Sequence, residues 1–336
     1  MSFPEHRPRR LRTSSAMRRL VAQTRVTVDD LVAPLFVREG ISEPAPIESL
    51  PGVVQHTRDS LRREVSELAA LGVPAVILFG VPEDKDDIGS GAWDPEGIVQ
   101  LALRDVRDEV GRDVVLMADL CLDEYTSHGH CGVISDTGDV DNDATLALYA
   151  KVALAQADAG VDVCAPSGMM DGQVAAIRGA LDAEGALDVG ILAYAAKYAS
   201  SLYGPFRDAV GVQIAGGDGV AGDRSGYQQD FRNAREALVE VRADVAEGAD
   251  MVMVKPAMSY LDVIAAARDE VDVPVAAYHV SGEYAMVHAA AQRGWVDLDG
   301  VALEQITAVR RAGADFVLTY FARHLAELFA RGVDGG

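Results

Sequence analysis

The run MVMVK at Met251–Lys255 decides the expected fold, because it is apolar at every position until its last. Similar runs lie upstream, AVILFG at residues 75–80 and VVLMAD at residues 114–119. A parallel strand that helices cover on both faces is apolar throughout, whereas a strand with one solvated face alternates. These runs therefore predict buried parallel strands.

Such runs alternate with helical patterns along most of the chain. Expected strands cover residues 33–37, 75–80, 114–119, 161–165, 189–194, 251–255, 273–279 and 316–320. Expected helices cover residues 58–71, 95–110, 143–159, 172–183, 233–247, 260–270, 283–292 and 323–331. Eight strand–helix repeats are typical of an α/β protein with a (β/α)₈ TIM barrel. A doubly wound open sheet is the alternative, but no glycine-rich dinucleotide turn follows the first strand.

The segments outside these repeats predict an arm and a lid. Residues 1–30, with RPRRLR at 7–12, precede the first strand and predict an extended N-terminal arm for oligomer contacts. Residues 31–336 predict a single catalytic barrel domain. A glycine-rich stretch at residues 211–223 falls between the fifth and sixth strands and predicts an active-site lid over about 198–230.

The composition limits the partners and the compartment. A formal charge of −22 argues against nucleic acid and anionic membranes as partners. Only four of the 30 basic side chains are lysines, as we expect of a protein adapted to high salt; a solvated acidic surface is the alternative. No apolar run is long enough for a bilayer and no secretory signal follows the N-terminus, so a cytoplasmic protein is expected. Three cysteines, Cys121, Cys131 and Cys164, favour metal binding or burial over disulfides.

Polar side chains stand at the carboxyl ends of six successive expected strands, where the active site of a barrel forms. They are Asp119, Ser167, Lys197, Lys255, Ser281 and Tyr320. Lys255 follows an apolar strand, so burial and a neighbouring ammonium both lower its pKa. A neutral amine can attack a carbonyl carbon and form a Schiff base. Lys197 ends the adjacent strand, and the pair predicts two reactive amines rather than two solvated lysines.

Two further segments carry candidate ligands. DLCLDEYTSHGHCG at residues 119–132 offers Cys121, Asp123, His130 and Cys131, which suit zinc with an open position; two buried cysteines beside a solvated turn is the alternative. YGPFR at 203–207 and GDRSGYQ at 222–228 place polar groups on the expected lid. Arginines there suit a carboxylate, although isolated arginines are usually surface groups.

Six ordered motifs extend these observations. They are DLCLDEYTSHGHCG (119–132), APSGMMDGQV (165–174), YAAKYASSLYGPFR (194–207), GDRSGYQ (222–228), MVKPAMSYLD (253–262) and YHVSGEYAM (278–286). In this order they resemble the porphobilinogen synthase (delta-aminolevulinic acid dehydratase) family. The likeness runs from RPRRLR to TYFARHLAE at 319–327, essentially the whole chain.

The resemblance implies a hydro-lyase of tetrapyrrole (haem) biosynthesis that condenses two molecules of 5-aminolevulinate into porphobilinogen with loss of two waters. It implies a Schiff base at Lys255 in the P site, another at Lys197 in the A site, and proton transfer by Asp119. The implied substrate-binding residues are Ser281 and Tyr320 for the P-site carboxylate, Arg207, Arg224 and Gln228 for the A-site carboxylate, and Ser167 and Tyr203.

The resemblance also implies metals and an assembly. Zinc would be held by Cys121, Asp123 and Cys131, magnesium through Glu240, and N-terminal arms would build a homo-octamer. Zinc-type members carry three cysteines, whereas Asp123 replaces the middle one here, so we expect a weaker zinc site. The glycine-rich stretch before Arg224 also looks longer than typical, which is expected to alter lid closure.

Two other functions compete. A class I Schiff-base aldolase on a TIM barrel needs one essential lysine and a phosphate site after the last two strands. Ser281 and Tyr320 stand there and suit a carboxylate better. A non-catalytic assembly or metal-storage barrel would leave two strand-end lysines unexplained.

Overall fold

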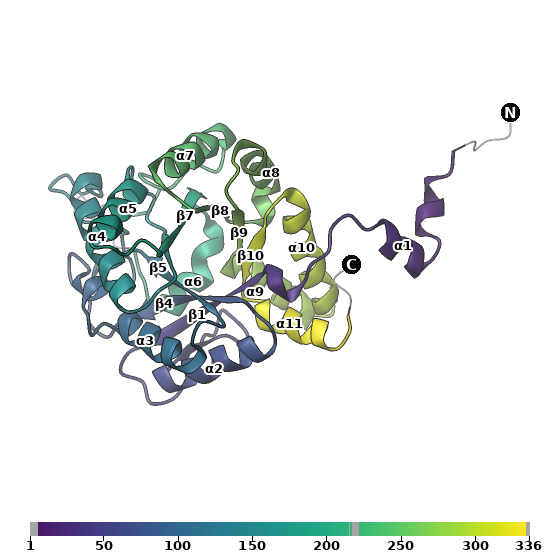
Figure 1. Ribbon diagram of the computed structural model, residues 1–336, viewed down its shortest axis with the longest axis horizontal. Coiled ribbons are helices and arrows are strands. Elements are labelled where there is room, and N and C mark those ends of the chain that lie inside the picture. Colours follow the sequence, from purple (N-terminus) through teal and green to yellow (C-terminus); the bar gives the residue numbers. More distant parts are fainter. Residues whose placement is uncertain (1–5, 215, 217–221, 334–336) are drawn as a thin grey trace.

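Eight parallel strands close into a barrel in the computed structural model, which describes residues 6–214, 216 and 222–333 (Figure 1). They are β1 (Leu31–Arg38), β4 (Ala75–Val81), β5 (Val115–Leu120), β6 (Val163–Pro166), β7 (Gly190–Lys197), β8 (Met251–Lys255), β9 (Val275–His279) and β10 (Phe316–Thr319). Strand β1 pairs with β4 on one side and with β10 on the other, where Leu31 lies opposite Val317. The (β/α)₈ barrel is thus confirmed, and the doubly wound sheet is wrong because an open sheet has two free edges.

Helices surround the barrel and bury the outer faces of the strands (Figure 1). They are α2 (Arg58–Ala70), α3 (Ile98–Val110), α4 (Asn142–Asp158), α5 (Gln173–Ala183), α7 (Ala234–Glu247), α8 (Leu261–Glu270), α9 (Ser281–Gln292), α10 (Leu298–Ala312) and α11 (Ala322–Ala330). Side chains fix several helix starts, since Thr57, Asp141 and Asp297 each accept a bond from a first-turn backbone N–H. Strand β4 is buried at every position, as a strand covered on both faces must be.

Some elements differ from the sequence prediction. The fifth expected strand, residues 189–194, extends as β7 to Lys197, because the ladder to β8 resumes after an irregularity between Ala193 and Ala196. Helix α10 was not predicted, although Ala302, Ile306 and Val309 are buried at helical spacing. Also unpredicted were the short helix α6 (Gly204–Val210) and the small pairing of β2 (Ala45–Pro46) with β3 (Val54–His56).

The N-terminal arm extends away from the barrel (Figure 1). It carries a 3₁₀ turn, Pro8–Arg12, and helix α1 (Ser15–Val21), neither of which buries a residue. Residues 1–5 of the predicted arm, residues 215 and 217–221 of the predicted lid, and residues 334–336 lie outside the described residues. Among the described helices, none combines the length and the apolarity needed to cross a bilayer.

Candidate active site

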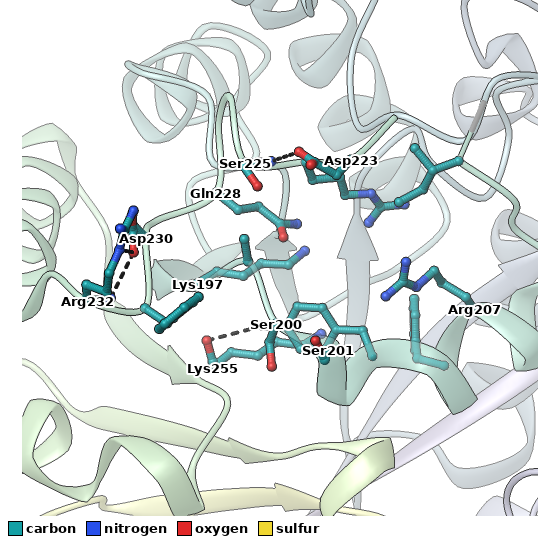
Figure 2. Close-up of a pocket in the computed structure, with 16 residues that line it drawn as sticks. Lys197, Ser200, Ser201, Arg207, Asp223, Ser225, Gln228, Asp230, Arg232 and Lys255 are labelled. Atoms are coloured by element: carbon teal, nitrogen blue, oxygen red, sulfur yellow. Dashed lines mark hydrogen bonds and ion pairs between the residues drawn. The ribbon is translucent and has the colours of Figure 1, made fainter. Parts of the chain in front are cut away.

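Two lysines define a pocket at the carboxyl rim of the barrel. Lys197 and Lys255 are the last residues of β7 and β8 and lie opposite each other in the ladder between these strands. Each side chain is only 4% exposed. The pocket measures about 450 Å³, within the range typical of small-molecule sites. Figure 2 shows both lysines in it, with Arg207 of α6 pointing toward them from across the cavity.

Four aromatic rings surround the amine of Lys255. Its Nζ lies 4.3 Å from the ring centre of Tyr278, 5.0 Å from Tyr194, 5.1 Å from Phe206 and 5.3 Å from Tyr203. Burial, reinforced by the charge of Lys197, lowers the pKa of Lys255 to about 7. A large fraction of this amine is therefore neutral and nucleophilic near neutral pH.

Three of these rings were not predicted from the sequence as site residues, namely those of Tyr194, Tyr278 and Phe206. Tyr194 and Tyr278 belong to expected strands, so the alternation of inward- and outward-facing positions was an available signal.

Lys197 has a polar environment instead. Its Nζ donates a hydrogen bond to the backbone oxygen of Ser167, at 2.5 Å. The Ser167 hydroxyl donates in turn to Asp119 Oδ2 at 3.0 Å. Burial raises the pKa of Asp119 to about 6, although the nearby Lys197 charge opposes the shift. Asp119 Oδ1 and the hydroxyl of Tyr194 are buried and have no hydrogen-bond partner within the described part of the chain. The site can therefore hold and move a proton beside the Lys197 amine.

A cluster of metal-ligand type lies next to Asp119. The donor atoms of Cys121, Asp123 and Cys131 are all within 4.8 Å of one another, and all three side chains are buried. Two thiols and a carboxylate are ligands that divalent metals take in proteins, so these residues fit a metal centre. Cys164 lies apart on β6, where burial raises the pKa of its thiol to about 12.

The three predicted A-site carboxylate ligands occupy different environments. Arg207 lines the pocket and, within the described residues, has no side-chain hydrogen bond or ion pair. Gln228 also lines it, and its buried Nε2 has no partner among those residues. Arg224 instead binds Asp123 Oδ2 at 2.7 Å. Burial alone would raise the pKa of Asp123, but the Arg224 guanidinium holds that pKa well below its usual range.

The two predicted P-site ligands do not line the lysine pocket. The Ser281 hydroxyl accepts a hydrogen bond from the Phe206 N–H at 3.0 Å and contacts the Leu202 carbonyl oxygen at 3.3 Å. Tyr320 shares a hydrogen bond of 3.2 Å with the hydroxyl of Tyr278. Ser281 is thus tied to the backbone around α6, while Tyr320 contacts the ring that lies closest to Lys255.

The comparisons with known proteins agree with this site. A sequence model of the family described as Delta-aminolevulinic acid dehydratase matches residues 5–328. The chain belongs to the delta-aminolevulinic acid dehydratase family. It is 60% identical over 323 residues to the delta-aminolevulinic acid dehydratase of Mycobacterium tuberculosis (strain H37Rv), covering 96% of each chain. It is 58% identical over 327 residues to that of Streptomyces coelicolor, covering 97% of each.

A solved structure of a delta-aminolevulinic acid dehydratase has the same fold. The porphobilinogen synthase of Toxoplasma gondii ME49, in complex with the reaction product porphobilinogen, is similar with a TM-score of 0.93. The two chains are 44% identical, and the match covers 96% of this chain and 91% of that one. The family resemblance expected from the six motifs is therefore confirmed.

The predicted magnesium ligand of this delta-aminolevulinic acid dehydratase family member lies away from the lysines. Glu240 of α7 lines a second pocket of about 360 Å³ with Asp171 and Glu236. Burial, followed by the charge of Asp171, raises the pKa of Glu240. Within the described residues, the groups of three or more candidate metal ligands do not include Glu240, so its role stays a prediction.

Proposed function

We propose that this protein is a porphobilinogen synthase, a hydro-lyase that condenses two molecules of 5-aminolevulinate into porphobilinogen with loss of two waters. The observation that carries this is the pair of buried lysines at matched ends of β7 and β8, in a family whose relatives bear that activity in their name. Two amines suit two carbonyl substrates. A single-lysine aldolase would leave Lys197 as a buried amine without a role.

The chemistry follows from the two amines. Lys255 Nζ attacks the carbonyl carbon of one substrate, a C=N bond forms, and water leaves, which makes that carbon electrophilic. Lys197 forms the second imine, and loss of a proton from the adjacent carbon gives an enamine, the carbon nucleophile. We assign that proton to Asp119, which is linked to Lys197 through Ser167. When a substrate amine closes the ring by C–N bond formation, it replaces the lysine and returns its free amine.

The remaining side chains would hold the substrates. We assign the A-site carboxylate to Arg207, Arg224 and Gln228, since two guanidinium groups and an amide can bind it at several points. We assign the P-site carboxylate to Ser281 and Tyr320, which requires Ser281 to exchange its present partners for the substrate. Ser167 and Tyr203 complete the substrate contacts.

We further propose zinc as the metal of Cys121, Asp123 and Cys131. When bound, it would polarise the amine or carbonyl of the A-site substrate. Magnesium would be held through Glu240, where acidic neighbours in the second pocket favour a cation.

The assembly and the habitat are also proposed. We assign the arm to contacts in a homo-octamer, because it exposes apolar side chains such as Leu20, 76% exposed, that gain from burial against another copy. The acidic, lysine-poor composition supports a cytoplasmic enzyme adapted to high salt.

Borohydride trapping tests the proposal. Reduction of the protein with 5-aminolevulinate is expected to leave a substrate adduct in the intact mass, and Lys255→Ala is expected to lose it. Zinc, magnesium and high salt are supplied in all samples. No adduct in the wild type under these conditions would leave the barrel standing and exclude the dehydratase activity.

The rate of trapping is expected to depend on pH through Lys255. Its pKa is lowered from the ordinary 10.5 to about 7, so the neutral fraction grows as pH rises through 7 and is nearly complete above 8. Trapping at Lys255 should therefore rise about tenfold per pH unit below 7 and then level off. Lys197→Met removes a cation and should move the midpoint upward. A rate that keeps rising to pH 10 in the wild type would contradict the lowered pKa.

Lys85 is expected to position α6 and with it Arg207. Lys85 Nζ donates to the backbone oxygens of Val210 at 3.4 Å and Gly211 at 3.2 Å, at the C-terminal end of α6. A cation there satisfies free carbonyls and the negative end of the helix dipole. Lys85→Met should raise KM for 5-aminolevulinate by roughly three- to thirtyfold with a smaller change in kcat. Lys85→Arg should restore most of KM; a KM that Lys85→Met leaves unchanged would contradict this role.

A further inference from the structure

The contact between Arg224 and Asp123 joins two parts of the site that the sequence predicted to act separately. Arg224 was expected to hold a substrate carboxylate, and Asp123 to bind a metal. In the structure the guanidinium donates to Asp123 Oδ2 at 2.7 Å and to the Gly129 carbonyl oxygen at 2.8 Å. Arg224 is 8% exposed and Asp123 is 3% exposed, so solvent hardly screens this ion pair.

Neighbouring contacts hold the same lid segment on the metal-ligand loop. The Tyr227 hydroxyl accepts a hydrogen bond from the Cys131 N–H at 3.4 Å. Gln228 stays in the lysine pocket with its buried Nε2 unpartnered among the described residues. Arg224 and Gln228 are one helical turn apart, since the Gln228 N–H donates to the Arg224 carbonyl oxygen at 2.9 Å. A modest turn of the Arg224 side chain therefore separates the metal cluster from the substrate pocket.

The physical conflict is between two cations for one carboxylate. A buried carboxylate must be paired, and Arg224 fulfils that need in the metal-free protein. A divalent ion bound by Cys121, Asp123 and Cys131 would stand a few ångströms from the guanidinium, where low dielectric makes like charges repel strongly. A cysteine at position 123 would offer the guanidinium a much weaker acceptor, so this competition depends on the aspartate.

We propose that Arg224 is an internal counter-ion of the metal site: it occupies Asp123 when no metal is bound, and metal binding displaces it toward the substrate carboxylate beside Gln228. The last step rests on the proposed function. Metal occupancy and the lid contact to substrate are thereby coupled. Arg224 is a positioning residue for the metal site in addition to its substrate role.

The first test is the affinity for Zn²⁺, measured on the full-length protein by competition with a chromophoric chelator and without substrate. Arg224→Met should tighten Zn²⁺ binding roughly tenfold to hundredfold, because the metal no longer displaces a buried charge-assisted hydrogen bond. Arg207→Met is the matched control, since it removes an equal charge from the same pocket without a bond to Asp123. It should change the affinity less than about threefold.

Three results would overturn the proposal. They are an unchanged or weaker affinity in Arg224→Met, an equal tightening in Arg207→Met, or no measurable Zn²⁺ binding in either wild type or Arg224→Met. Because substrate is absent, these results are independent of porphobilinogen formation. A protein that behaves as expected here but makes no porphobilinogen would contradict the proposed function alone.

Hydrogen exchange provides a second test that does not depend on Arg224→Met folding. Adding Zn²⁺ to the wild type should speed amide exchange at residues 224–228, because the anchor on Asp123 is released. Asp123→Asn should show fast exchange there already without metal. Zn²⁺ that slows exchange of this segment, or Asp123→Asn with wild-type protection, would also overturn the proposal.

Discussion

Lys255→Met is expected to lower the rate of porphobilinogen formation roughly ten-thousandfold or more. Methionine retains the apolar stem that packs among the four rings, but it has no amine to form the imine. The loss should appear in kcat, measured as porphobilinogen released from saturating 5-aminolevulinate. The melting temperature should not fall, because the substitution replaces a buried amine with an apolar group of similar length.

Lys197→Met is the matched comparison for Lys255→Met. It should also stop turnover, yet borohydride should still trap one substrate on Lys255, since that amine keeps its aromatic environment. Lys255→Met activity above about one-hundredth of the wild type would show that the imine at Lys255 is dispensable and would return the single-lysine reading to consideration, with Lys197 as the reactive amine.

The barrel and its lysines were predictable because their signals are local. A buried parallel strand is apolar over consecutive residues, and MVMVK carries both the strand and the reactive group at its end. The rim position then follows from the fold, since every parallel strand ends on the same side. Helix α10 was equally visible in principle, because Asp297 caps it and Ile306 and Val309 face inward.

The contacts that tune the site could not be read from local patterns. Arg224 and Asp123 are 101 positions apart, and the segment between them spans three barrel strands. Their pairing depends on how the lid folds back over the metal-ligand loop. The amine-to-ring contacts of Lys255 likewise come from β7, β9 and α6, and the irregularity in β7 sets which residues face the pocket. Sequence reasoning named the groups; tertiary packing decided their partners.

Asp119→Asn is expected to reduce kcat roughly a hundredfold to ten-thousandfold, as removal of a general acid–base group does. The amide has the same shape and can still accept the Ser167 hydrogen bond, so the connection from Asp119 through Ser167 to Lys197 persists while proton transfer is lost. Single-turnover measurements should show the block after the first imine. Borohydride trapping at Lys255 should therefore stay at the wild-type level.

Ser167→Ala separates proton transfer from the positioning of Asp119. The Lys197 amine bonds to the backbone oxygen of Ser167, which alanine retains, so only the hydroxyl contact to Asp119 is removed. We expect kcat to fall by no more than about tenfold, the usual cost of one neutral-to-charged hydrogen bond. If Ser167→Ala and Asp119→Asn are equally impaired, the carboxylate acts through its orientation of Ser167; if Asp119→Asn turns over normally, another group moves the proton.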